Sequence, residues 1–166
     1  MPVPARFVLR DLSIASLAAG LLILTRSLTG EPSVAARALQ VLTGLGVAVG
    51  AALLHEWGHL LGSLLTGSRV RFPKRTLTPL LFDFDVAANT RRQFLAMSFG
   101  GYAGSALGMV LLAWVLPPTQ LAGYVAWLVA GGGLLATLVL ELPTTLRVLR
   151  GGAPPAALLT VADADE

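Results

Sequence analysis

The sequence contains four apolar runs, each long enough to cross a lipid bilayer as a helix. They cover residues 12–28, 39–66, 94–116 and 120–142. A membrane span needs about 20 apolar residues, because a helix rises about 1.5 Å per residue through about 30 Å of hydrocarbon. Only 13% of the residues are charged, whereas soluble domains carry about 25%. We therefore expect an all-α membrane protein with four transmembrane helices in a single domain, residues 1–150, followed by a mobile tail, residues 151–166.

The first run has two interpretations. It follows Arg6 and Arg10, and a basic start before an apolar middle is also typical of a secretory signal peptide. The sequence Ala36-Arg37-Ala38, with a small residue on each side of Arg37, resembles a cleavage site for such a peptide. We expect a retained first span, and the alternative is a cleaved one. The other three spans keep their orientation in either case.

Proline residues mark the ends of the last two spans. Pro117 and Pro118 separate them, and Pro143 follows the fourth. Proline lacks the backbone N–H and disfavours helix in the residue before it. The sequence therefore predicts a hairpin of the third and fourth helices, with the fourth ending at Pro143.

Basic residues predict the orientation of the spans. Four spans bring the N-terminal segment, the loop of residues 67–93 and the C-terminal segment to one side. Of the 12 basic residues, only Arg26 and Arg37 fall on the other side. Positive loops stay in the cytoplasm, so we expect both termini there. The bases form no continuous patch, so no nucleic-acid partner is expected. The preference for arginine over lysine is typical of a bacterium with a GC-rich genome. We therefore expect the protein in the inner membrane of a bacterium.

The second run carries the two histidines of the chain, in the sequence His55-Glu56-Trp57-Gly58-His59. Residues four apart lie on one helical face, so both imidazoles can bind one Zn²⁺ ion. Glu56 can then take a proton from the attacking water as general base. The absence of cysteine excludes thiolate ligands and cysteine catalysis. The alternative is an inert, hydrogen-bonded pair of histidines inside a helix bundle.

A His-Glu-x-x-His motif inside a transmembrane helix resembles the site-2 protease family of intramembrane zinc metallopeptidases. Residues 59–67 resemble that family's small-residue helix, and residues 100–108 resemble its glycine-rich third helix, particularly in the small bacterial branch. The resemblance covers about residues 40–150 in outline. It implies an integral membrane endopeptidase with zinc near the cytoplasmic face. The charge pattern agrees, because it places His59 near the cytoplasmic end of its span.

Several acidic residues are candidates for the third zinc ligand. The resembled family uses an aspartate in a Leu-Asp-Gly motif, and Arg150 stands at that position here. Apart from Glu56, Glu141 is the one acid embedded at the end of a span, where an unpaired carboxylate is costly. We therefore expect Glu141 as the third ligand. Asp83, Asp85 and the acids of the tail remain alternatives.

The loop of residues 67–93 carries further candidate residues. Residues 81–85 alternate apolar and acidic side chains, which is the period of a strand. We expect a short β-hairpin in which Asp83 and Asp85 hold an extended substrate by strand addition; the alternative is a solvated loop. Asn89 either caps the third helix or hydrogen-bonds the substrate or the oxyanion.

Glycines recur at fixed spacing in the spans. Gly100, Gly101 and Gly104 would leave room for a substrate backbone beside the zinc, whereas the alternative interpretation is close helix packing. The three glycines at residues 131–133 predict either a hinge or a close contact.

Together these patterns predict an intramembrane zinc metalloprotease that hydrolyses a peptide bond in a transmembrane or juxtamembrane segment. Its partners would be the lipid bilayer and a membrane protein or membrane-anchored peptide as substrate. With no appended soluble domain expected, substrate choice would rest on the loop, the tail or an accessory membrane protein. The alternative is a catalytically inactive member that binds or scaffolds, and Arg150 is its best support.

Overall fold

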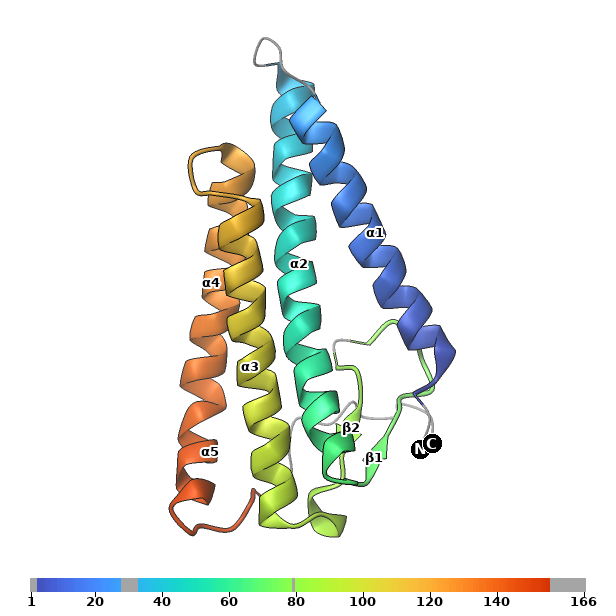
Figure 1. Ribbon diagram of the computed structural model, residues 1–166, viewed down its shortest axis with the longest axis vertical. Coiled ribbons are helices and arrows are strands. Elements are labelled where there is room, and N and C mark those ends of the chain that lie inside the picture. Colours follow the sequence, from blue (N-terminus) through green and yellow to red (C-terminus); the bar gives the residue numbers. More distant parts are fainter. Residues whose placement is uncertain (1–2, 28–32, 79, 156–166) are drawn as a thin grey trace.

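The computed structural model describes residues 3–27, 33–78 and 80–155, and its regular structure is mostly helical (Figure 1). The helices are α1 (Ala5–Ser27), α2 (Val34–Leu65), α3 (Arg91–Val115), α4 (Leu121–Leu140) and α5 (Leu142–Leu149). Four helical segments are long and apolar enough to cross a membrane, with α4 and α5 counted as one. The predicted number of apolar helices is thereby confirmed, while membrane insertion stays a prediction.

The first two helices begin earlier than their apolar runs. α1 starts directly after Pro4, and α2 starts after Ser33, whose hydroxyl accepts a hydrogen bond from the Ala36 N–H at 3.1 Å. Proline and serine are both favoured at helix starts. Both helices thus begin before the first residue of the apolar run that predicts them.

α2 lies between α1 on one side and α3 and α4 on the other (Figure 1). Its contact with α3 is made by glycines. A Cβ atom at Gly58 would overlap the Gly100 carbonyl oxygen, and one at Gly104 would overlap the Leu54 carbonyl oxygen. Small residues let helix backbones approach this closely, so the two helices meet backbone to backbone.

The third and fourth helices form the predicted hairpin around Pro117 and Pro118 (Figure 1). The indole N–H of Trp127 donates to the Leu116 carbonyl at 3.1 Å and closes this turn.

α4 ends at Leu140, close to Pro143, where the sequence predicts the end of the fourth helix. α5 continues it to Leu149 after an irregular turn at Glu141. Pro143 lies in the first turn of α5, where a missing N–H costs no intrahelical hydrogen bond. The proline is thus accommodated at the start of α5, and the helical segment continues past it to Leu149.

The predicted hairpin is present as two very short strands. β1 (Val70–Arg71) pairs antiparallel with β2 (Asp83–Phe84), with Val70 opposite Phe84, and a 3₁₀ helix, η1 (Val86–Ala88), follows. The hairpin lies at the same end as α5 and the start of α1 (Figure 1). Phe84 joins the main apolar core there, together with residues from the helices around it: Phe7, Leu60, Phe94 and Val148.

Asn89 does not cap the third helix. Thr90 does, because its hydroxyl accepts from the Gln93 N–H while the Gln93 side chain accepts from the Thr90 N–H. This reciprocal arrangement is a capping box. Residues 156–166, which include the tail acids considered as alternative ligands, lie outside the described residues, as does Glu31.

Candidate metal centre

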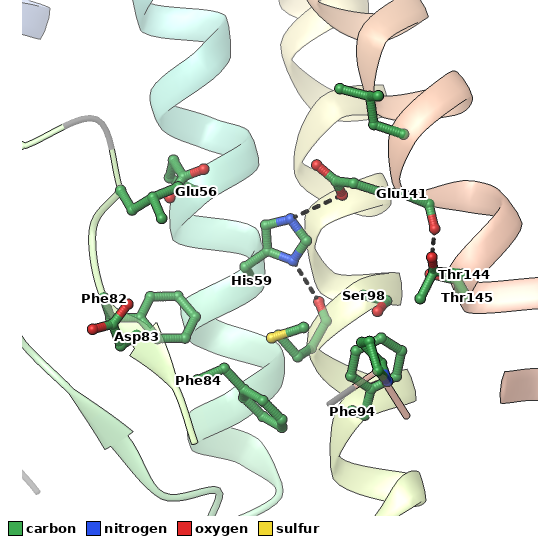
Figure 2. A pocket seen from close by; sticks show the side chains of 14 residues that line it. Glu56, His59, Phe82, Asp83, Phe84, Phe94, Ser98, Glu141, Thr144 and Thr145 are labelled. Carbon is green, nitrogen blue, oxygen red and sulfur yellow. Dashed lines mark hydrogen bonds and ion pairs between the residues drawn. The ribbon is translucent and has the colours of Figure 1, made fainter. Parts of the chain in front are cut away.

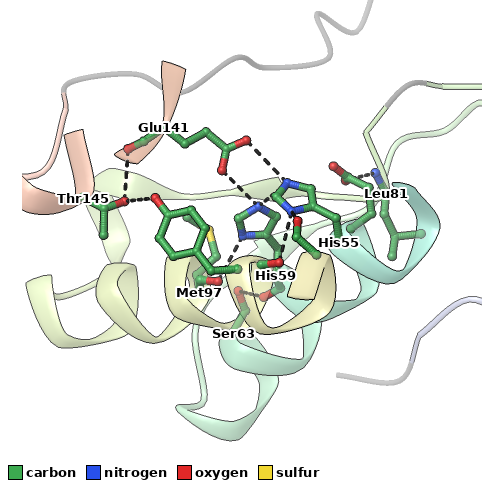
Figure 3. Close-up of polar contacts among 11 residues, drawn as sticks. His55, His59, Ser63, Leu81, Met97, Glu141 and Thr145 are labelled. Carbon is green, nitrogen blue, oxygen red and sulfur yellow. Dashed lines mark hydrogen bonds and ion pairs between the residues drawn. The ribbon is translucent and has the colours of Figure 1, made fainter. Parts of the chain in front are cut away.

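Two histidines and one glutamate converge where α2 faces the turn between α4 and α5 (Figure 3). His55 and His59 project from one face of α2, and their Nε2 atoms lie 3.0 Å apart. Oε1 of Glu141 lies 3.4 Å from Nε2 of His55, and Oε2 lies 3.4 Å from Nε2 of His59. Within the described chain, no other group of three such side chains is close enough to share an ion. The structure thus gathers the three residues expected as zinc ligands and leaves Asp83 and Asp85 out.

Hydrogen bonds determine which ring nitrogen of each histidine carries the proton. Nδ1 of His55 lies 3.1 Å from the Gly101 carbonyl oxygen and 2.8 Å from the Ser105 hydroxyl. Nδ1 of His59 lies 3.0 Å from the Met97 carbonyl oxygen. A carbonyl oxygen only accepts, so each Nδ1 carries a proton and donates it. When both imidazoles are neutral, their Nε2 atoms present lone pairs to the same point.

A metal ion fits this arrangement. Two Nε2 lone pairs and a carboxylate face one another across 3.0–3.4 Å, and acceptors this close repel unless a proton or cation lies between them. Ligands arranged tetrahedrally at about 2.0–2.1 Å from zinc lie about 3.3 Å apart. Two imidazoles and a carboxylate are also a known ligand set of catalytic zinc, and the Nδ1–H bonds are the usual support of metal-binding imidazoles.

Gly101 makes room for one of the imidazoles. A Cβ atom at this position would overlap the His59 ring, whereas Cβ atoms at Gly100 and Gly104 would overlap the backbone of α2. The described residues that line the cavity beside the site include none of the three. These contacts agree with close helix packing, because α2 and the His59 ring lie directly against the three glycines; a contact of these glycines with substrate stays a prediction.

The position of Glu141 depends on the irregular turn between α4 and α5. Its carbonyl oxygen accepts from the Thr145 N–H at 3.0 Å and from the Thr145 hydroxyl at 3.2 Å. The Thr145 hydroxyl also lies 2.8 Å from the Tyr102 hydroxyl of α3. Sequence reasoning missed Tyr102 and Thr145, because they lie 43 residues apart and neither belongs to a local motif.

A cavity of about 280 Å³ opens beside His59 (Figure 2). Glu56 and Glu141 line it as well, so the predicted base shares the cavity with two predicted ligands. Oε2 of Glu56 accepts a hydrogen bond from the backbone N–H of Leu81 at 3.2 Å. Most of the remaining wall is apolar and comprises Leu80, Phe82, Phe84, Phe94, Met97 and Leu140.

The predicted substrate contacts of the loop fall into two groups. Asp83 lines the cavity from β2. Asp85 and Asn89 are absent from the described cavity wall. The Asp85 carboxylate accepts from the Ala88 N–H at 3.1 Å, and the Asn89 amide donates to the Arg69 and Asp85 carbonyls at 2.7 and 2.8 Å. Both side chains hold the hairpin together and do not face the site.

Known proteins provide no match from which the role of this site could be inferred. No protein-family model matches the chain, and no curated protein and no solved structure is significantly similar to it.

Proposed function

We propose that this chain is a membrane-embedded zinc metalloendopeptidase resembling the site-2 protease family. The observation that carries the proposal is the convergence of His55, His59 and Glu141 beside a cavity that Glu56 also lines. When bound, Zn²⁺ supplies a Lewis acid that polarises a carbonyl group and makes water more acidic.

The residues of the chain divide the remaining work. His55, His59 and Glu141 would hold the ion through Nε2, Nε2 and the carboxylate. Glu56 would accept a proton from water as the water oxygen bonds to the scissile carbonyl carbon. When the C–N bond breaks, Glu56 would return that proton to the amine nitrogen. The Leu81 N–H engages one carboxylate oxygen of Glu56 at 3.2 Å, which leaves the other oxygen for this transfer.

The cavity supports an apolar, extended substrate. Its wall is mostly aromatic and aliphatic, which suits side chains of a membrane segment. In the described chain β2 pairs with β1, and a peptide bound along this strand would extend the sheet by β-augmentation. Asp83 and Phe84 of β2 line the same cavity. A peptide held there would be unwound and would present its carbonyl groups beside His59.

The proposed setting is the inner membrane of a bacterium, with the metal centre toward the cytoplasm. The hairpin, α5 and the start of α1 lie at one end of the molecule (Figure 1), and that end carries ten basic side chains. They are Arg6, Arg10, Arg69, Arg71, Lys74, Arg75, Arg91, Arg92, Arg147 and Arg150. Positive charge marks the cytoplasmic side of membrane proteins.

The alternative of a catalytically inactive protein is weakened by the position of Glu141. It depends on Arg150, which stands where the resembled family has its aspartate. Glu141 lies 3.4 Å from both imidazoles, so a carboxylate is available without a ligand at position 150.

The test is the Glu56→Gln variant in detergent-purified protein and in cells that express a membrane-anchored reporter with an apolar segment. We expect wild type to cleave the reporter and the variant to lose at least 100-fold in rate, with zinc content unchanged. Asp85→Asn, which changes a carboxylate outside the cavity, is the matched control and should keep its activity. Wild type without bound zinc, or a variant that still cleaves, contradicts the proposal.

A further inference from the structure

α1 carries a buried ionic group that contacts α2 directly beside the predicted base. Asp11 is only 6% exposed, and its carboxylate accepts from Arg10 at 2.6 Å (Nε to Oδ1) and 3.2 Å (Nη2 to Oδ2). Its Oδ2 also accepts from the indole N–H of Trp57 at 2.8 Å. A carboxylate in an apolar helix is costly unless it is paired. These contacts therefore fix the start of α1 against α2.

The same end of α1 holds the loop that connects β1 and β2. Nη1 of Arg10 donates to the Thr76 carbonyl oxygen at 2.7 Å. One turn earlier, Nη2 of Arg6 donates to the Pro73 carbonyl oxygen at 2.6 Å. Because this part of the loop has no regular secondary structure, its backbone carbonyls find their partners in α1 and not in a sheet.

Apolar contacts continue this attachment toward the cavity. Phe7 is fully buried and packs against Phe72, with 5.8 Å between ring centroids. The loop then returns to α2 at Leu81, which is 1% exposed. There the Leu81 N–H donates to Glu56. Phe7 and Leu81 belong to the same buried apolar cluster, and Phe72 and Trp57 pack against it, so α1, the loop and the part of α2 that carries the predicted base are joined by packing.

We propose that Arg10 and Asp11 are positioning residues for Glu56. Asp11 orients the Arg10 guanidinium, Arg10 holds the loop, and the loop keeps the Leu81 N–H on the Glu56 carboxylate. This inference rests on the peptidase function proposed above. A displacement of about 1 Å in a catalytic group can cost about 100-fold in rate, so loosening the loop reduces catalysis without touching the metal ligands. α1 is then a working part of the enzyme.

The first test compares Asp11→Asn and Arg10→Gln with Arg26→Gln. Arg26 lies on the same helix, but its guanidinium donates to the Val115 carbonyl at the opposite end. In full-length, zinc-loaded protein we expect kcat for the reporter to fall at least 10-fold in the first two variants, with KM within twofold and one zinc per chain. Arg26→Gln should stay within twofold of wild type. Arg10→Lys, which keeps a donor for Thr76, should recover part of the loss.

A second measurement does not depend on activity. Hydrogen exchange of the peptide that contains Leu81 should quicken about 10-fold in Asp11→Asn and Arg10→Gln, and should not change in Arg26→Gln. Unchanged exchange overturns the inference even if wild type cleaves nothing. A kcat loss that only follows zinc loss, or an equal loss in Arg26→Gln, also overturns it, since either result indicates a general structural role. If wild type binds zinc and never cleaves while exchange responds as expected, the peptidase proposal fails and the attachment of the loop stands.

Discussion

The two faces of α2 are built in different ways. Toward α3 the helix is packed backbone to backbone, and this side seats His55 and His59 against fixed carbonyl groups. Toward α1 it meets a polar network and an irregular loop, and this side carries Glu56 and Trp57. Metal ligands need a fixed geometry, which close packing of glycines provides. The predicted base, Glu56, is instead oriented by groups from segments distant in the sequence. Substitutions in those segments are therefore expected to change the orientation of Glu56 and not that of the histidines.

The largest expected effect breaks the packed face. Gly101→Ala places a methyl group on the His59 ring, so we expect zinc affinity to fall at least 100-fold. The control is Gly131→Ala, because a Cβ atom there meets nothing within 4 Å. Metal content of both purified variants, measured by mass spectrometry, checks the difference. Full zinc loading of Gly101→Ala would contradict this expectation, because it would mean that the contact between α2 and α3 can accept a methyl group beside the His59 ring.

A smaller effect on the same face comes from the support of His55. Ser105→Ala removes the hydroxyl that lies 2.8 Å from Nδ1, while the Gly101 carbonyl still accepts. Loss of such a supporting group costs about 10–100-fold in metal affinity, and we expect the lower end. Ser13→Ala is the control, since that hydroxyl only bonds its own helix at Leu9. Zinc competition with a chelator measures both, and equal affinities would show that the Ser105 hydroxyl gives no support.

The opposite face is tested by Trp57→Phe. This change removes the indole N–H that donates to the buried Asp11 carboxylate. Arg10 still donates to this carboxylate, and the loss of one hydrogen bond to a charged group costs about 1.5–3 kcal/mol, so the melting temperature in detergent should fall by several degrees. Zinc content should not change, because the two histidines predicted as ligands lie on the other face of α2 and Glu141 lies between α4 and α5. A variant that loses zinc in proportion to stability would contradict the division between the two faces.

The smallest effect concerns the glycines of α4. Of the two alternatives for these glycines, a close contact is not seen among the described residues, because Cβ atoms at Gly131, Gly132 and Gly133 meet nothing within 4 Å. Gly132→Ala should therefore stabilise the helix by up to about 1 kcal/mol and leave cleavage unchanged. A large loss of activity in this variant would favour the hinge interpretation instead.

The histidine pair was predictable from sequence, because ligand spacing on a helix is a local property. The proximity of Glu141 to the histidines was predictable too, because few acids are embedded in apolar runs and each can be considered as a candidate ligand. Asp11 was not recognised, because it looks like an ordinary polar residue at the start of a span. Its partner Trp57 lies 46 residues away, and only tertiary structure joins them. Glycine spacing left close packing and substrate contact as alternatives for the same reason, since spacing does not tell which neighbour fills the space.

The most direct test of the metal centre is anomalous diffraction at the zinc edge from crystals of the full chain. The account predicts one peak, about 2.0–2.2 Å from Nε2 of His55, Nε2 of His59 and a carboxylate oxygen of Glu141. In Glu141→Ala the peak should weaken strongly, and in Glu56→Gln it should persist. A peak on the two histidines and Asp83, or no peak in zinc-supplemented wild type, would contradict it.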